Sequence, residues 1–242
     1  GDGIAYAEID PARARARTVW GEPILKQRRP DLYMELMTNT FAWNPGDFFR
    51  LYGHRPLPEG RKAKVAVAEM EPVDDPAANL RTIAEIAKEI ALEGAELIVF
   101  PELALTGLSR PAETAVATDA PPLVHLQRIA ADLGIYLVAG FAERDGDACY
   151  NSAVLAGPEG IVGTYRKIHL TEAEKGWARA GDSWAVFDLP FGRLGLLIGH
   201  DMSFPEAGRI LALKGCDLIA CPAAVRDRFH ASHDGTLSLI HI

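Results

Sequence analysis

The stretch Leu97-Ile98-Val99-Phe100-Pro101-Glu102 decides the fold of this 242-residue chain. Four apolar residues in a row are typical of a strand that is buried on both faces. A helix is expected before it, because apolar residues recur at helical spacing over Leu80–Ala91. Asp75 and Pro76 supply the start of that helix and Gly94 its end. The sequence therefore predicts a helix, a tight loop and a buried strand that ends on a carboxylate.

Strands and helices continue along the chain from about residue 64. Two more helices are expected, at Pro121–Leu133 and Pro205–Lys214. The other expected strands are Lys64–Glu69, Tyr136–Ala142, Asn151–Ala156, Ile161–Tyr165, Ala185–Leu189, Leu194–Ile198 and Asp217–Ala220. Hairpin-like turns at residues 157–160 and 190–192 join several of them. This pattern favours an α+β or α/β class with a mixed sheet, or two packed sheets flanked by helices, over a simple parallel sheet.

The composition is that of an ordinary globular protein, with 48% hydrophobic and 24% charged residues. The formal net charge of −8 argues against binding to nucleic acid, which requires a basic surface. No apolar run approaches the roughly 20 residues that cross a bilayer, so no membrane partner is expected. Three cysteines without a CxxC pair argue against a disulfide framework. A reducing, cytoplasmic location is the prediction.

Three predicted strands each end on polar or charged residues. Glu102 follows the first of these strands, and Lys167 follows the strand Ile161–Tyr165. The sequence Gly199-His200-Asp201 follows the strand Leu194–Ile198 and precedes a helix. Sites in α/β proteins form where strand ends meet at one edge of a sheet. We therefore expect these three segments to converge.

Several motifs at these strand ends resemble those of one family, the nitrilase superfamily of carbon–nitrogen hydrolases. They are PELALTG (Pro101–Gly107), YNSAVL (Tyr150–Leu155), YRKIHL (Tyr165–Leu170), the AGD turn (Ala180–Asp182) and GHDMSFPEAGRILALKGCDLI (Gly199–Ile219). They stand in the family's usual order, and the resemblance covers roughly residues 64 to 225. It implies a four-layer α-β-β-α sandwich whose C-terminal part is missing. It also implies chemistry that needs no metal and no cofactor.

The resemblance also implies roles for particular residues. In the family a glutamate acts as general base, a cysteine thiolate attacks an amide, nitrile or carbamoyl carbon, and a lysine stabilises the oxyanion. Carried over, Glu102 is the base and Lys167 the oxyanion partner. Glu174 is the second carboxylate, with Glu172 as the alternative. Asp201 has a structural role beside the nucleophile turn.

The sequence departs from the family at the nucleophile. Gly199 occupies the position where the family has cysteine, and glycine cannot form a thioester. Two other nucleophiles stay open as alternatives: Cys221 at the end of the next strand, and Ser203, for which no neighbouring base is evident. His200 and Tyr150 are the candidate substrate-binding residues.

The first part of the chain carries a second resemblance. GIAYAEID (Gly3–Asp10) and RRPDLY (Arg28–Tyr33) are similar to the C-terminal end of a nitrilase-type domain. We therefore predict a piece of a tandem protein. Residues 1–36 are then the tail of an upstream domain, 37–62 a linker, 63–236 an incomplete second domain and 237–242 an artefactual tail.

Two functions follow as expectations. The first is a hydrolase that acts on non-peptide C–N bonds of a small amide, nitrile or N-carbamoyl substrate, with the cysteine replaced by Gly199 in this domain. The alternative is a non-catalytic domain that binds a ligand or supports an active neighbour. The family resemblance implies association into homo-oligomers or a contact between tandem domains.

Overall fold

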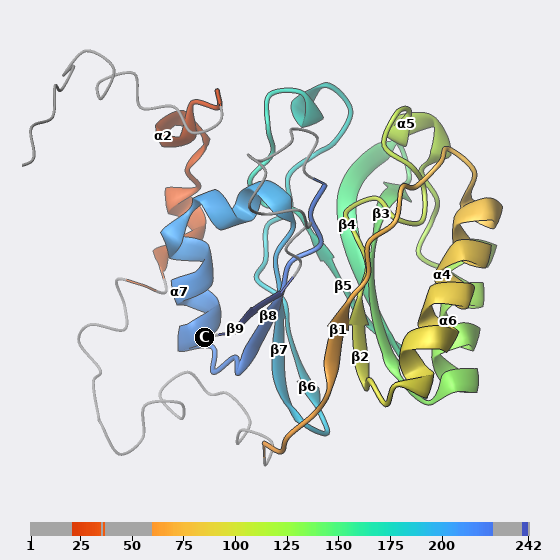
Figure 1. Ribbon diagram of the computed structural model, residues 1–242. Coiled ribbons are helices and arrows are strands. Elements are labelled where there is room, and N and C mark those ends of the chain that lie inside the picture. The colour runs from red at the N-terminus through yellow and green to blue at the C-terminus, as the bar shows by residue number, and fades with distance from the viewer. Residues whose placement is uncertain (1–20, 35, 37–59, 225–238, 242) are drawn as a thin grey trace, which may run out of the picture.

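The computed structural model describes residues 21–34, 36, 60–224 and 239–241. Two sheets pack face to face between helices, which makes a four-layer α-β-β-α sandwich (Figure 1). Helices α4 (Pro76–Leu92) and α6 (Pro121–Leu133) cover the outer face of the first sheet, and α7 (Pro205–Leu213) covers the second. The predicted fold class is confirmed. Most of the predicted tail and linker, at residues 1–20 and 37–59, lies outside the described residues.

The first sheet follows chain order. Its strands are β1 (Val65–Val67), β2 (Leu97–Val99), β3 (Tyr136–Asp145), β4 (Ala148–Gly157) and β5 (Gly160–Arg166). Strands β1, β2 and β3 are parallel, whereas β3, β4 and β5 pair antiparallel through hairpins. Leu97 and Val99 pack between the two sheets, while Ile98 and Phe100 pack under α4 and α6. Burial on both faces explains the uninterrupted apolar run of β2.

The second sheet has four described strands in the order β6, β7, β8, β9. Their bounds are Val186–Leu189, Gly192–Leu196, Leu218–Ala220 and Leu239–His241. Strands β7 and β8 are parallel and are connected by α7, whereas the other two pairs are antiparallel. The prediction of an artefactual tail at residues 237–242 did not anticipate β9. That prediction stays untested.

The helix ends confirm the predicted start and stop residues. Asp75 accepts hydrogen bonds from the backbone N–H groups of Ala77 (2.9 Å) and Ala78, and Pro76 opens α4. Gly94 follows the end of α4 with a φ of 83°, in the left-handed region that favours glycine. Helix α4 therefore begins and ends where the sequence predicts, whereas α7 ends at Leu213, one residue before the predicted Lys214.

Some elements differ from the predicted ranges. The hairpin between β3 and β4 continues to the pair Asp145–Ala148, so both strands are longer than their apolar cores. Strand β7 begins two residues before the predicted Leu194 and ends at Leu196. Helix α5 (Pro111–Thr114) and the 3₁₀ helices η3 (Glu174–Gly176) and η4 (Gly199–Ser203) were not predicted. One-turn elements are too short for helical periodicity to be recognised.

The described part of the N-terminal segment lies against the second sheet's helix layer. It contains α2 (Ile24–Gln27) and the 3₁₀ helix η1 (Pro30–Leu32), which lie beside α7 (Figure 1). The buried ring of Tyr33 belongs to the core between the sheets, and Ile24 and Leu32 pack against that core. Among the described residues, no helix is both long and apolar enough to cross a bilayer.

Candidate active site

Glu102 stands in a tight turn after β2. Phe100 continues the strand pairing through its N–H, which donates to the carbonyl of Val138 (2.8 Å). Leu103 then adopts a φ of 56°, a conformation that costs energy for a residue with a side chain. Gly140 lets β3 approach this turn closely, since a Cβ there would lie 2.7 Å from the Cα of Glu102. The turn therefore fixes Glu102 at the carboxyl edge of the first sheet.

Lys167 and Asn151 come from the antiparallel end of the same sheet. Asn151 lies in β4, and its carbonyl accepts a hydrogen bond from the N–H of Lys167 (2.8 Å), directly after β5. Side chains alternate between the two faces of a strand, so these two neighbours can point to the same face. The side chain of Lys167 is only 2% exposed.

The structure brings Glu102, Lys167 and Glu174 together. The ammonium Nζ of Lys167 lies 2.8 Å from Oε1 of Glu102 and 2.6 Å from Oε1 of Glu174. The amide nitrogen of Asn151 donates to the same two oxygens, each at 2.7 Å. Glu174 is held by Thr171, whose N–H donates to its other oxygen (2.8 Å). We call these four side chains, Glu102, Asn151, Lys167 and Glu174, the Glu–Lys cluster.

Glu172, the alternative second carboxylate, does not join the Glu–Lys cluster. Its carboxylate is largely exposed and pairs with Lys175 at 2.5 Å. It also accepts a hydrogen bond from the side chain of Gln27 (3.2 Å). Of the two candidates, the geometry selects Glu174.

The surroundings of the cluster shift the pKa values of its two carboxyl groups in opposite directions. Burial raises the pKa of Glu102, and the nearby Lys167 opposes this only in part. Burial also acts on Glu174, but the attraction of Lys167 outweighs it and lowers that pKa. Burial alone would lower the pKa of Lys167, yet its two carboxylate partners raise it. Environments that separate two carboxyl pKa values are typical of acid–base sites.

Gly199 faces this cluster from the second sheet. It has a φ of 42°, and its N–H donates to the carbonyl of Pro222 (2.9 Å). A Cβ added at Gly199 would lie 2.7 Å from Oε2 of Glu102. That same oxygen accepts a hydrogen bond from the N–H of Ala224 (3.1 Å). A side chain at position 199 would thus point at the carboxylate of Glu102.

A second buried carboxylate, Asp201, holds the turn at Gly199 in place. One oxygen accepts hydrogen bonds from the backbone N–H (2.8 Å) and the ring Nδ1 (2.9 Å) of His169. The other accepts from the hydroxyl of Tyr165 (2.8 Å) and the N–H of Ile198 (3.0 Å). Burial, with Asp201 alongside, raises the pKa of Tyr165 well above its usual value, so the phenol keeps its proton. The contacts of Asp201 are those of a structural anchor.

The family model for carbon–nitrogen hydrolases matches residues 64–234. The chain belongs to the carbon–nitrogen hydrolase family. It is 44% identical to a nitrilase of Pyrococcus abyssi over 168 residues, 66% of this chain and 64% of the relative. It is 34% identical to a citrullinase of Francisella tularensis over 180 residues, 69% of this chain and 63% of the relative. The chain thus spans less than two thirds of the length of these curated relatives.

Solved structures give the same family. An amidase from Nesterenkonia sp. matches with a TM-score of 0.64 and 26% identity, over 72% of this chain and 69% of that one. A Saccharomyces cerevisiae protein from branch 10 of the nitrilase superfamily matches with a TM-score of 0.62 and 25% identity, over 69% of each chain. The two-sheet sandwich of this chain is therefore the nitrilase fold, and the family acts on amides and nitriles.

The two predicted substrate-binding residues of this carbon–nitrogen hydrolase domain lie outside the Glu–Lys cluster. His200 is buried, and its Nε2 lies 2.8 Å from Oε1 of Gln27. Burial, with Lys167 nearby, lowers the pKa of His200 and favours the neutral ring. Tyr150 precedes Asn151 on β4 and therefore points to the opposite face, where its ring lies under the guanidinium of Arg166 (3.8 Å). The structure does not bring Tyr150 to the cluster.

The two alternative nucleophiles have different surroundings. Cys221 is fully buried, and burial raises the pKa of its thiol far above the usual value, which makes it unreactive. Ser203 has a neighbouring base after all, because its hydroxyl lies 3.3 Å from Nδ1 of His200. The expectation that Ser203 lacks a base was wrong, since η4 places residues 200 and 203 on one side of a turn. This contact is long, and a hydroxyl needs a well-aligned base to act as a nucleophile.

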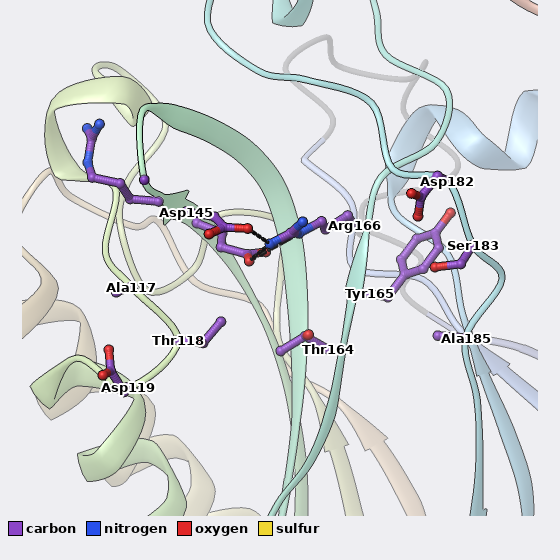
Figure 2. Close-up of a pocket in the computed structure, with 13 residues that line it drawn as sticks. Ala117, Thr118, Asp119, Asp145, Thr164, Tyr165, Arg166, Asp182, Ser183 and Ala185 are labelled. Carbon is purple, nitrogen blue, oxygen red and sulfur yellow. Dashed lines mark hydrogen bonds and ion pairs between the residues drawn. The ribbon is translucent and has the colours of Figure 1, made fainter.

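A groove of about 670 Å³ opens along the edge strand β5 (Figure 2), and no residue of the Glu–Lys cluster lines it. Arg166 lies in it, bonded to Glu143 and, at 2.8 Å, to Asp145. Asp182 and Ser183 line the side that belongs to the second sheet. The guanidinium of Arg166 is already paired with these carboxylates. The residues expected to act on a C–N bond do not line this groove.

Sequence reasoning missed Asn151 as a site residue. It is fully buried, and its Oδ1 is the one buried side-chain oxygen or nitrogen without a hydrogen bond among the described residues. Two adjacent polar residues, Asn151 and Ser152, in an otherwise apolar strand were the available signal. Among the described residues, no group of three His, Cys, Asp or Glu side chains is arranged to hold a metal ion.

Proposed function

We propose that this domain binds a small amide- or nitrile-type molecule at the Glu–Lys cluster but does not form the family's covalent intermediate. The main support for this proposal is the missing side chain at Gly199. A Cβ there would lie 2.7 Å from Oε2 of Glu102, so position 199 is where a family nucleophile would meet its base. Glycine supplies no thiol, and removing a nucleophile costs on the order of a millionfold in rate.

The remaining groups suit recognition of a carboxamide or nitrile. The ammonium of Lys167 can polarise a carbonyl oxygen or a nitrile nitrogen. The buried Oδ1 of Asn151 accepts no hydrogen bond from the described residues and is available to an amide N–H. The carboxylate of Glu102 is a second acceptor. These groups could hold such a molecule without covalent bond formation.

One of the solved relatives supports the idea that an amide can still bind when the thiol is absent. A variant of the Nesterenkonia amidase with a cysteine changed to alanine was solved in complex with butyramide. Its TM-score to this chain is 0.64 with 26% identity, over 72% of this chain and 70% of that one. Butyramide is therefore a reasonable probe for the chain described here.

The test measures butyramide binding by calorimetry and ammonia release on the full chain. We expect saturable binding without ammonia, and loss of binding in Lys167→Met at a temperature where circular dichroism shows that this variant is folded. Arg61→Ala is the matched control, because it removes a cation from an exposed ion pair with Glu96 far from the cluster. Ammonia release that disappears in Glu102→Gln would contradict the proposal.

A second candidate keeps hydrolysis in the longer protein. Two observations favour it: the assembled Glu102, Lys167 and Glu174, and the resemblance of Arg28–Tyr33 to the end of another such domain. In this account an upstream domain with its own cysteine hydrolyses the C–N bond. The complete protein would then release ammonia from a panel of amides, nitriles and N-carbamoyl compounds. No release, together with an upstream domain that also lacks its cysteine, would refute it.

A further inference from the structure

The N-terminal segment Glu22–Met34 makes an extended series of contacts with the carbon–nitrogen hydrolase domain. Arg28 pairs with Glu206 of α7 at 2.6 Å, and the indole N–H of Trp184 donates to the carbonyl of Leu32 (3.2 Å). Arg29 donates to the carbonyl of Gly181 (3.1 Å). These contacts join residues more than 150 positions apart in the sequence. The segment is therefore docked on the domain along its length.

Gln27 connects this segment to the turn at Gly199. It is 6% exposed, and its amide nitrogen donates to the carboxylates of Glu22 (2.6 Å) and Glu172 (3.2 Å). Its Oε1 must then be the atom that accepts from Nε2 of His200, 2.8 Å away. His200 accordingly carries its proton on Nε2, and its Nδ1 is left to accept from the hydroxyl of Ser203.

Tyr33 makes the corresponding contact with the second histidine. Its hydroxyl lies 2.7 Å from Nε2 of His169 and accepts a hydrogen bond from the N–H of Arg29 (3.2 Å). Because Nδ1 of His169 faces a carboxylate oxygen of Asp201, that nitrogen carries the proton. Nε2 of His169 therefore accepts from the hydroxyl of Tyr33. The two histidines hold opposite tautomers, and each faces one residue of the docked segment.

We propose that the face formed by His169, Trp184 and His200 is a docking surface for the chain's own segment Glu22–Met34. Through Gln27 the segment fixes the tautomer of His200, and through the hydroxyl of Tyr33 it donates to Nε2 of His169, whose tautomer Asp201 sets. Gln27 and Tyr33 are positioning residues in this account, since each acts through a histidine. The segment contacts the two histidines next to the turn at Gly199 although it stands before the domain in the sequence, and this inference does not depend on whether the cluster binds amides.

The tautomers give a direct test on the full chain. Long-range ¹H–¹⁵N spectra of the imidazole rings should show the proton of His200 on Nε2 and that of His169 on Nδ1. Gln27→Ala should release the preference of His200 alone, and Tyr33→Phe should shift the Nε2 signal of His169 alone. The opposite tautomers in the unmodified chain, or equal changes of both rings in both variants, would overturn the proposal.

Chemical labelling tests the docking itself. Diethyl pyrocarbonate should modify the exposed His125 faster than the buried His169 and His200. Gln27→Ala should raise the labelling rate of His200 about five- to tenfold, the factor expected when one buried hydrogen bond is lost. Leu25→Ala is the matched control, because Leu25 lies in the same short helix α2 but is 53% exposed. Labelling of His200 as fast as His125 in the unmodified chain would refute a docked segment.

Dilution shows whether the docked segment belongs to the same chain or to a second copy. The protection of His200 should persist at concentrations where light scattering shows a monomer. Protection that disappears together with a dimer would show that another copy supplies the segment, and would overturn docking within one chain.

Discussion

Glu102 and Asp201 are both buried carboxylates of this sandwich, and their surroundings differ. Asp201 accepts four hydrogen bonds, two of them from backbone N–H groups, and has no lysine or arginine partner among the described residues. Glu102 shares one ammonium with Glu174 and lies beside the unpaired Oδ1 of Asn151. Its Oε2 also faces the position where Gly199 lacks a side chain. Asp201 thus accepts hydrogen bonds on both oxygens from its own fold, whereas Glu102 faces a position that has no side chain.

If Gly199 stands at the nucleophile position, as proposed, the difference indicates which parts of the family architecture are kept when the thiol is lost. Asp201, His169 and Tyr165 remain because they are buried and hydrogen-bonded to one another, so the loss of one would leave a buried polar group without its partner. The Glu–Lys cluster also remains, since each buried charge depends on the other. Only the thiol can be removed without leaving a buried charge unpaired.

Lys167→Met should have the largest effect on stability. It leaves Glu102 and Glu174 without their cation, and breaking a buried pair costs about 3–5 kcal/mol. The two carboxyl pKa values should then rise above those of the unfolded chain. Folded carboxyls would bind protons that the unfolded chain has released, so the variant should lose further stability as pH rises from acid to neutral. Urea unfolding across that range measures both effects.

The control for this change is Lys175→Met, which removes a lysine from the exposed pair with Glu172. Exposed pairs contribute at most about 1 kcal/mol, so this variant should unfold close to the unmodified chain. Equal losses in both variants would mean that the cluster is not a buried ion pair.

Asp201→Asn should have the next largest effect, about 2–3 kcal/mol. The amide keeps one acceptor oxygen but turns an NH₂ group toward groups that are themselves donors. Thermal unfolding measures the loss. Asp145→Asn is the control, since Asp145 is exposed and Glu143 still holds its partner Arg166. If Asp201→Asn unfolds like this control, the contrast between the two buried carboxylates is wrong.

Glu174→Gln should have a smaller effect, about 1 kcal/mol, because Gln keeps one acceptor oxygen for Lys167, which also retains Glu102, while Thr171 loses its acceptor. Lys167 lowers the pKa of Glu174 below its usual value, so the ion pair stabilises the fold above that value and is lost as pH falls. The variant should therefore lose less stability on acidification than the unmodified chain. Identical acid limbs in chemical unfolding would contradict the lowered pKa.

Much of the fold followed from the sequence, because its main signals are local. The run Leu97–Phe100 predicts a strand that is buried on both faces, and Asp75, Pro76 and Gly94 set the ends of α4. The one-turn helices α5 and η4 carry no periodic signal. The final strand β9 pairs with a partner chosen by tertiary packing, which no local pattern reports.

The site residues also fall into those that local motifs predicted and those that they did not. Strand-end motifs and their family resemblance pointed to Glu102, Lys167 and Glu174, which the structure brings together. Tyr150 was chosen from the same motif as Asn151, but the alternation of β4 turns Tyr150 away. Gln27 and Tyr33 approach the nucleophile turn from a segment that lies far away in the sequence. Such long-range contacts depend on how the layers pack.

Alkylation of Gly199→Cys by iodoacetamide, followed by peptide mass mapping, tests the central claim most directly. The left-handed φ at this position should cost about 1–2 kcal/mol, and the Glu102 carboxylate must shift to admit the new Cβ. The new thiol lies against the Glu102 carboxylate, which is paired with the ammonium of Lys167, and it should react much faster than the three buried native cysteines. Its rate should fall when Lys167→Met is added. A folded variant whose thiol at 199 is as inert as Cys221 would contradict an empty nucleophile position at this site.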